Sequence, residues 1–315
     1  MRFLIHKALW PAITVALALA AIATACGGEE EAAPATATPS PSPPFPVAVS
    51  GSDGKSVTLA AAPQRIVALA PSFVEVLYAV GAGDSLVAVD QNTDFPPEAA
   101  AKTKISGFQP SVEGIADQSP DLVIITFDPG GLREALERLD IKVLNLNAPE
   151  SVQGVFDQIQ LLGRATGHQG EAAKLVSDMR AGIDAITAKL ADLPQGPTVF
   201  HELDSTYYTA GPGSFVDDLY STLKARNIAE AAGQPYPQMS ADAIIQANPQ
   251  VIVLADEDAG ESPQTVAARP GWGHIAAVQD QRVYTADPDI VSRPGPRLVD
   301  ALHALAELLY PDRFP

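Results

Sequence analysis

The residue types that usually carry catalysis occur in this chain without the spacing that catalysis requires. Gly211-Pro212-Gly213-Ser214-Phe215 does not match the Gly-x-Ser-x-Gly turn that exposes a serine nucleophile. His201-Glu202 lacks the second histidine of a zinc-protease helix, and no glycine-rich loop ends in a phosphate-binding lysine. We therefore expect a binding protein and not an enzyme.

The side chains that could build a binding site are aromatic, and several follow apolar runs that predict strands. Phe127 directly follows one such run, and Tyr207 and Tyr208 lie a few residues beyond another. Ser72 and Ser214 stand where a predicted strand passes into a helix. Ligands of open α/β sheets bind beyond the carboxyl ends of the strands. These positions predict a ligand site with aromatic walls.

Two sets of apolar runs must position these residues. The predicted strands are 65–69, 86–89, 122–125 and 143–146 in the first set and 198–200, 251–254 and 282–284 in the second. Runs that are apolar throughout are typical of strands covered by helices on both faces. The sequence therefore predicts an α/β protein with two lobes.

A helical stretch separates the two sets. Apolar residues recur at helical spacing from Val152 to Leu162 and again from Leu175 to Leu190. A helix over residues 171–192 would be roughly 33 Å long at about 1.5 Å per residue. Such a helix is long enough to brace one lobe against the other.

Two segments of the first set recur in the second. Residues 72–78 reappear as 214–220, with five of seven positions identical. Residues 111–125 reappear as 240–254, in the order serine cap, short helix with an acid in its first turn, proline and strand. The two acids are Glu113 and Asp242. The repeats predict that the two lobes are related.

The amino-terminal residues are predicted to export and tether the chain. Arg2 and Lys7 precede an apolar stretch that ends in small residues before Cys26, the layout of a secretory signal. This end is similar to a bacterial lipobox, in which the cysteine is lipidated, although alanine stands where leucine is usual. The tether is rich in proline, alanine, threonine and serine. The predicted divisions are a signal peptide 1–25, Cys26 with a disordered tether 26–57, an N-terminal lobe 58–148, linking helices 149–194 and a C-terminal lobe 195–315.

The balance of acidic and basic residues limits the classes of partner that the chain could bind. The chain has 38 acidic and 20 basic residues and a formal net charge of −18. This charge argues against nucleic acid as a partner and favours a basic protein surface. The single cysteine excludes an internal disulfide and a zinc site built from several thiolates.

Five segments in order carry a family resemblance. They are 63–72, 94–99, 208–215, 236–238 and 289–293. Together they resemble the helix-linked, class III periplasmic binding proteins of ABC importers, whose ligands are vitamin B12, ferric siderophores and haem, over nearly all of residues 58–315. Tyr236-Pro237-Gln238 is similar to the Trp-Pro-Gln motif of the cobalamin-binding branch. The resemblance implies two Rossmann-like lobes joined by a single long α-helix, with a rather rigid ligand cleft between them.

The resemblance also implies a ligand, which is cobalamin or a related corrinoid, carried as cargo with no resident cofactor or metal. A corrinoid is a broad disc fringed with amides, so flat aromatic walls and a few polar groups suit it. The residues expected to bind it are Ser72, Phe108, Phe127, Tyr207, Tyr208, Tyr236, Asp289 and Arg293.

Partners follow from the same resemblance. Carboxylates at the positions of Glu113 and Asp242 dock in this family into arginine pockets of the two permease subunits, and two related acids suit a two-fold partner. We expect a monomer outside the cytoplasm, held at the membrane by the lipid on Cys26 and delivering its ligand to an ABC permease dimer with its ATPase.

A ferric siderophore or haem is the alternative ligand. Anionic siderophores tend to need several arginines, whereas only Arg293 stands out, with Arg297 nearby. A zinc or manganese receptor usually presents several histidines to one ion, and no histidine-rich tract occurs here. His201 lies within a predicted strand, where core packing is more common than metal ligation. These features favour a near-neutral corrinoid.

Overall fold

The computed structural model describes residues 45–256 and 259–315. The predicted signal peptide, Cys26 and the first part of the predicted tether lie outside these residues. All of the described residues belong to one unit of the chain. No helix among them is long and apolar enough to cross a lipid bilayer.

The N-terminal lobe is built on a five-stranded parallel sheet in the order β5-β4-β3-β6-β7. Its central strands are apolar along their whole length because helices cover both faces. The strands are β3 (Ile66–Ala68), β4 (Leu86–Asp90), β5 (Thr103–Ile105), β6 (Leu122–Ile125) and β7 (Lys142–Asn145), and the helices are α1 (Pro71–Ala79), α2 (Val112–Ala116) and α3 (Leu132–Glu137).

The C-terminal lobe repeats this plan with a four-stranded parallel sheet in the order β11-β10-β8-β9. Its strands are β8 (Thr198–Glu202), β9 (Arg226–Asn227), β10 (Val251–Leu254) and β11 (Val283–Thr285). Its helices are α6 (Phe215–Thr222), α7 (Ala241–Ala247), α8 (Pro263–Ala267), α9 (Ala276–Gln279), α10 (Pro288–Val291) and α11 (Leu298–Leu309). Short 3₁₀ turns lie at Gly83–Ser85, Pro97–Ala101, Pro129–Gly131, Glu230–Ala232 and Trp272–His274.

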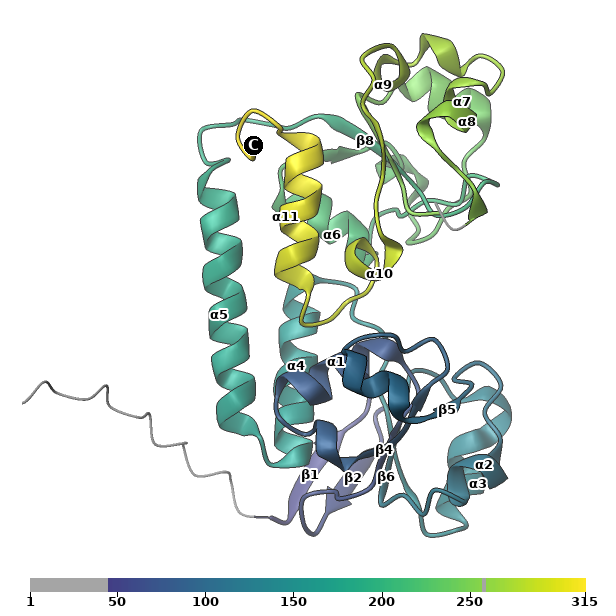
Figure 1. The fold of residues 1–315 in the computed structure, drawn as a ribbon, viewed down its shortest axis with the longest axis vertical. Coiled ribbons are helices and arrows are strands. Elements are labelled where there is room, and N and C mark those ends of the chain that lie inside the picture. Colours follow the sequence, from purple (N-terminus) through teal and green to yellow (C-terminus); the bar gives the residue numbers. More distant parts are fainter. Residues whose placement is uncertain (1–44, 257–258) are drawn as a thin grey trace, which may run out of the picture. The chain divides into compact units, whose positions relative to one another are not determined.

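Two antiparallel helices, α4 (Val152–Thr166) and α5 (Gln169–Ala188), connect the lobes (Figure 1). Ser151 caps α4, and Gly167 ends it with a φ of 81°, a left-handed conformation that favours glycine. His168, just before α5, lies beside Gly81 of the N-terminal lobe. Beyond the other end of α5, Asp192 forms an ion pair with Arg313 of the C-terminal lobe. Helix α5 therefore spans both lobes, as the linking helix was expected to do.

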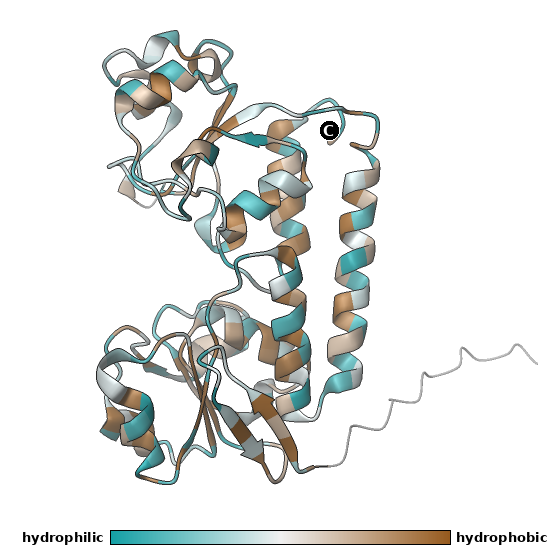
Figure 2. Ribbon diagram, turned by 180° about the vertical axis from the view of Figure 1, so that it is seen from behind, coloured by the Kyte–Doolittle hydropathy of each residue, from teal (hydrophilic) through white to brown (hydrophobic). Residues whose placement is uncertain are grey.

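One continuous apolar core joins the lobes to the linking helices. It includes Leu77 of the N-terminal lobe, Ile159 of α4, Val176 of α5, and Leu219 and Leu302 of the C-terminal lobe. Apolar residues, brown in Figure 2, run along the strands of both sheets and the helices beside them. Closely packed cores resist deformation, so the shared core opposes free movement of one lobe relative to the other.

A hairpin corrects the predicted tether. Strands β1 (Val47–Ser50) and β2 (Ser56–Leu59) pair antiparallel, so the prediction of disorder was wrong for this part of residues 26–57. Alternate side chains, including Val49 and Leu59, enter the main core beside α4. Valine and leucine alternating with polar residues give the hairpin the buried face that the proline-rich segment lacks.

Candidate ligand-binding site

The carboxyl ends of the two sheets are joined by side-chain contacts. Arg293, which follows α10 in the C-terminal lobe, donates from Nη1 to Glu75 Oε1 at 2.9 Å and to Asp94 Oδ1 at 3.0 Å. Glu75 lies on α1, which follows β3, and Asp94 follows β4. In parallel α/β sheets this edge is where ligands bind. The contacts bring together segments that follow the carboxyl ends of strands in the two lobes.

Glu75 accepts hydrogen bonds from two arginines of the other lobe. Arg297 is bidentate to it, with Nε to Oε2 at 3.0 Å and Nη2 to Oε1 at 2.7 Å. The Glu75 side chain is almost fully buried, and the side chains of both arginines are largely buried. The chain between the arginines is Pro294-Gly295-Pro296, and a Cβ built at Gly295 would lie 3.7 Å from Glu75 Oε2. This segment lies against α1, so the arginines reach the buried carboxylate.

The carboxyl groups of Asp94 and Asp289 interact across the lobes. Burial raises the pKa of Asp94, but hydrogen bonds from Asp289 and Arg293 outweigh burial and lower that pKa to about 2. Burial and the hydrogen bond to Asp94 raise the pKa of Asp289 to about 6. Arg293 also donates to the carboxylate of Asp289, the predicted polar pair. Asp289 is thus the carboxyl group that gains a proton first as pH falls.

A pocket of about 340 Å³ lies between segments from the two lobes. Its lining from the N-terminal lobe and the following connection is Thr126 and residues 147–150, and its lining from the C-terminal lobe is Gly213, Pro235 and Tyr236. Burial and then the charge of Glu150 raise the pKa of Tyr236. Tyr236 nevertheless keeps 58% of its surface exposed. The pocket therefore contains one predicted ligand-binding aromatic residue.

Other predicted aromatic residues also stand open. The rings of Phe108 and Phe127 meet edge to face beyond β5 and β6, with centroids 5.8 Å apart. Both are exposed, as is Tyr208, whose backbone pairs with Gln238 next to the Tyr236 segment. Exposed aromatic rings at a ligand-binding edge provide apolar surface for a flat ligand.

Two predicted ligand-binding residues are covered by the protein itself. Tyr207 packs against Trp272, with ring centroids 5.5 Å apart, and the Arg269 guanidinium lies 5.2 Å from the Tyr207 ring centroid. Ser72 is 8% exposed and faces Gly295. Their place in the ligand site stays a prediction, with less free surface than the other aromatic residues have.

His201 is a core residue. Its side chain is fully buried in β8, and its Nδ1 lies 2.8 Å from Tyr220 Oη. Burial lowers its pKa to about 4. Within the two described ranges, no group of three or more histidine, cysteine or acidic residues could hold a metal ion.

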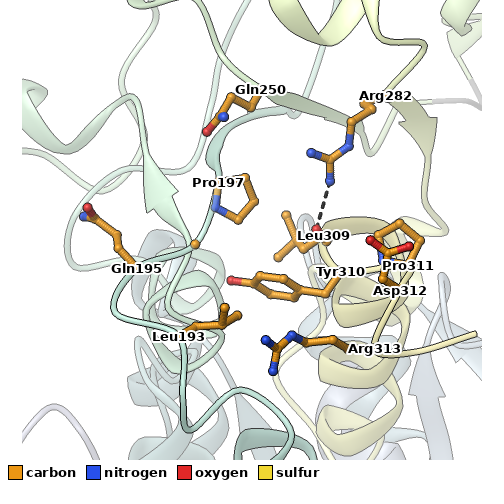
Figure 3. Close-up of a pocket in the computed structure, with 11 residues that line it drawn as sticks. Leu193, Gln195, Pro197, Gln250, Arg282, Leu309, Tyr310, Pro311, Asp312 and Arg313 are labelled. Atoms are coloured by element: carbon orange, nitrogen blue, oxygen red, sulfur yellow. Dashed lines mark hydrogen bonds between the residues drawn. The ribbon is translucent and has the colours of Figure 1, made fainter.

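Another pocket, of about 520 Å³, lies elsewhere (Figure 3). Pro197, Gln250 and Arg282 line it, and each precedes a strand of the C-terminal sheet. Arg282 donates to the Leu309 carbonyl at 2.8 Å, the dashed line in Figure 3. The pocket is therefore at the amino edge of the sheet, opposite the edge where α/β proteins bind ligands.

The repeated acids occupy equivalent positions in the two lobes. Glu113 and Asp242 are exposed second residues of α2 and α7. Ser111 caps α2 by accepting from Gly114 N at 3.1 Å, and Ser240 caps α7 by accepting from Ala243 N at 3.2 Å. This cap-and-acid arrangement is the one that the sequence repeat predicted.

Several residues of the candidate site were not identified as ligand-site residues from the sequence, among them Glu75, Asp94, Phe95 and Glu150. Phe95 is partly exposed, and the Arg297 guanidinium lies 4.6 Å from its ring centroid. A signal existed for Glu75, because a single acid among apolar residues of a helix needs a partner. Its partner could not be identified without the fold, since Arg293 is 218 residues away.

The family model for periplasmic binding proteins matches residues 66–290. The uncharacterized ABC transporter substrate-binding lipoprotein YvrC of Bacillus subtilis is 34% identical over 274 residues, covering 84% of this chain and 86% of the relative. A cobalamin-binding protein of Halobacterium salinarum is 29% identical over 268 residues, covering 81% of this chain and 72% of that protein.

A solved structure shares the fold. The periplasmic vitamin B12 binding protein BtuF of Vibrio cholerae superposes with a TM-score of 0.68 at 26% sequence identity, covering 78% of this chain and 96% of that chain. The fold expectation of two α/β lobes in the helix-linked class is therefore confirmed.

Proposed function

The chain belongs to the periplasmic binding protein family, and we propose that it captures cobalamin or a related corrinoid outside the cytoplasm for delivery to an ABC permease. The chain is the substrate-binding component of an ABC transporter of the vitamin B12, siderophore and haem family. The choice of a corrinoid over a ferric siderophore or haem is the proposal.

One observation carries this choice. Open aromatic rings stand beyond the carboxyl ends of both sheets, while Arg293 and Arg297 at the contact between the lobes are paired with the chain's own carboxylates. A broad, amide-fringed disc gains from stacking on such rings and needs no unpaired arginine to neutralise a charge. Phe108, Phe127, Tyr208 and Tyr236 are the proposed walls, and Asp289 and Arg293 the proposed orienting groups.

The path to the permease starts at the paired acids. We assign Glu113 and Asp242 to docking because they are exposed, lie at equivalent helix positions in related lobes and match a two-fold basic partner. Lipidation of Cys26 would anchor the protein to the outer face of the cell membrane. A Cys26→Ser variant should then appear in the medium or periplasm in place of the membrane fraction.

The ligand is tested by calorimetric titration of the purified full chain with cyanocobalamin, beside haem and a panel of ferric siderophores. We expect saturable binding of one cyanocobalamin per chain. The same titration is made with the Asp289→Ala, Tyr236→Ala double variant, which should fold and bind cyanocobalamin more weakly than the wild type. Binding of haem or a siderophore without cyanocobalamin would keep the transport role and overturn the choice of ligand.

A further inference from the structure

The two arginines at the candidate site face a carboxylate that lies deeper than they do. Glu75 accepts three hydrogen bonds from them, at 2.9 Å from Arg293 and at 3.0 and 2.7 Å from Arg297. Arg293 also pairs with Asp94 and Asp289. This interlobe cluster therefore holds three carboxyl groups and two guanidinium groups, and it is negative when all five are ionised.

The structure holds the cluster in place. Glu75 is 3% exposed on α1, and the prolines on both sides of Gly295 restrict the backbone between the two arginines. A bidentate arginine has used the planar fork with which it would recognise a carboxylate or catecholate. An anionic ligand would have to displace Glu75, and a buried carboxylate without a partner is strongly destabilising.

Two further cations, Lys104 in β5 and Arg269 just after α8, are also engaged. Arg269 pairs with Glu202 at 2.5 Å and with Glu261 at 2.7 Å. Lys104 donates to the backbone carbonyl of Thr93 at 2.5 Å. At the interlobe pocket, the ionisable lining groups are Glu150 and Tyr236, and neither carries a positive charge.

We propose that Glu75 is a specificity-determining residue: by neutralising Arg293 and Arg297 it excludes anionic chelates and restricts the ligand to large chelates without net negative charge. The proposal rests on the proposed function only in placing the ligand between the lobes. It does not depend on the ligand being a corrinoid.

The test is a set of four probes that separates charge from chemical class. Cyanocobalamin and ferrichrome are neutral, whereas haem and ferric enterobactin are anionic at neutral pH. We would measure the affinity of the full chain for each and express discrimination as the ratio of neutral to anionic affinity. The wild type should favour the neutral probes by at least about 100-fold, which corresponds to about 2.7 kcal/mol.

Glu75→Gln keeps the shape of the side chain and removes its charge, so it leaves Arg297 without a carboxylate partner and Arg293 with only Asp94 and Asp289. We expect this variant to reduce the discrimination ratio at least about tenfold. Adding Arg297→Gln to Glu75→Gln removes one freed positive charge and should restore most of the ratio. If Glu75 had only a structural role, Glu75→Gln would weaken the binding of all four probes by a similar factor and leave the discrimination ratio unchanged.

Asp94→Asn is a second route to the same measurement, because Asp94 is more than half exposed and its loss leaves the core intact. The substitution removes one carboxylate partner of Arg293. It should lower the discrimination ratio as Glu75→Gln does, but by a smaller factor. An unchanged ratio in the folded Glu75→Gln chain, or in Asp94→Asn if Glu75→Gln does not fold, would overturn the proposal.

The outcomes separate this inference from the corrinoid assignment. Tight binding of ferrichrome and not of cyanocobalamin would contradict the corrinoid and support exclusion by charge. Equal affinity of the wild type for cyanocobalamin and haem would be consistent with a corrinoid as the ligand and would overturn the proposal that anionic chelates are excluded.

Discussion

The rings of Phe108 and Phe127 pack edge to face at 69°, although Phe108 keeps 79% of its surface exposed. A pair that stays open to solvent contributes little to folding and is available to a ligand. We expect Phe127→Ala to weaken ligand binding about tenfold, because an aromatic contact is worth about 0.5–1.5 kcal/mol beyond its buried area. Calorimetric titration with cyanocobalamin measures the effect.

The control for this variant is Leu139→Ala. Leu139 is also an exposed apolar side chain, but it precedes β7 and so lies at the amino edge of the same sheet. Neither substitution should change the free energy of unfolding by more than about 1 kcal/mol. Equal affinities for the Phe127→Ala and Leu139→Ala chains would remove Phe127 from the site.

Strand prediction succeeded for the buried inner strands and for the edge strands β7 and β11, and failed for the edge strands β5 and β9. Leu122–Ile125 is apolar throughout because it lies inside the N-terminal sheet. Strand β5 was missed because it is an edge strand of the N-terminal sheet whose first two residues are exposed. Strand β9 was missed because it is an edge strand of the C-terminal sheet and has only two residues. Edge strands that are very short or exposed carry little of the apolar signal on which prediction depends.

Prediction of the site shows a similar division. Asp289 and Arg293 could be paired from sequence because they are four residues apart on one turn. The pairing of Glu75 with Arg297 depends on how the two lobes pack, which no local pattern encodes. The sequence also could not tell that Tyr207 packs on Trp272 while the neighbouring Tyr208 is exposed.

Tyr236 is expected to act through its ring and not through its hydroxyl. It is exposed at the interlobe pocket, and none of its side-chain atoms is held by a hydrogen bond to the described residues. Tyr236→Ala should therefore weaken cyanocobalamin binding about tenfold, whereas Tyr236→Phe should keep the aromatic surface and the affinity. Equal losses in the two variants would show that the hydroxyl group carries the contact.

Charge reversal separates docking from ligand binding. Glu113→Lys with Asp242→Lys should abolish uptake and leave ligand affinity unchanged, because both side chains are exposed and outside the interlobe cluster. The matched control is Glu171→Lys with Asp184→Lys, the same charge change at exposed positions of α5. Transport assays in cells and titration of the purified chains give the two readouts. Normal uptake by the first double variant would refute docking at these acids.

His201 should make the fold sensitive to acid. Its folded pKa of about 4 lies below the unfolded value of 6.5, because the buried imidazole resists a positive charge. Above pH 6.5 both states are neutral; as pH falls toward 4 the unfolded chain gains a proton that the folded chain does not. This difference lowers the free energy of unfolding by about 2 kcal/mol at pH 5.

Urea unfolding between pH 7.5 and pH 4.5 tests this. The comparison chain is the His201→Leu, Tyr220→Phe double variant, which removes both partners of the buried hydrogen bond and leaves no polar atom unpaired there. Carboxylates elsewhere affect both chains equally, so the difference between them isolates the histidine. Parallel pH dependence in the two chains would contradict the prediction.

Asp256 should have the opposite pH dependence. Burial and the charge of Glu202 raise its pKa to about 7, Glu261 adds to this and Arg269 opposes it. Its carboxyl group contributes stability below pH 3.8, the unfolded value, and that contribution is lost as pH rises through about 7. Neither carboxyl oxygen accepts a hydrogen bond from a donor group in the described residues.

We therefore expect Asp256→Asn to stabilise the protein progressively as pH rises. Its gain in free energy of unfolding over the wild type should grow by about 2 kcal/mol between pH 5 and pH 8, since the amide stays neutral where the buried carboxylate ionises. Asp280→Asn, at an exposed carboxylate of the same lobe, is the control and should show no such growth. A gain for Asp256→Asn that is the same at both pH values would mean that Asp256 ionises as readily in the folded chain as in the unfolded one.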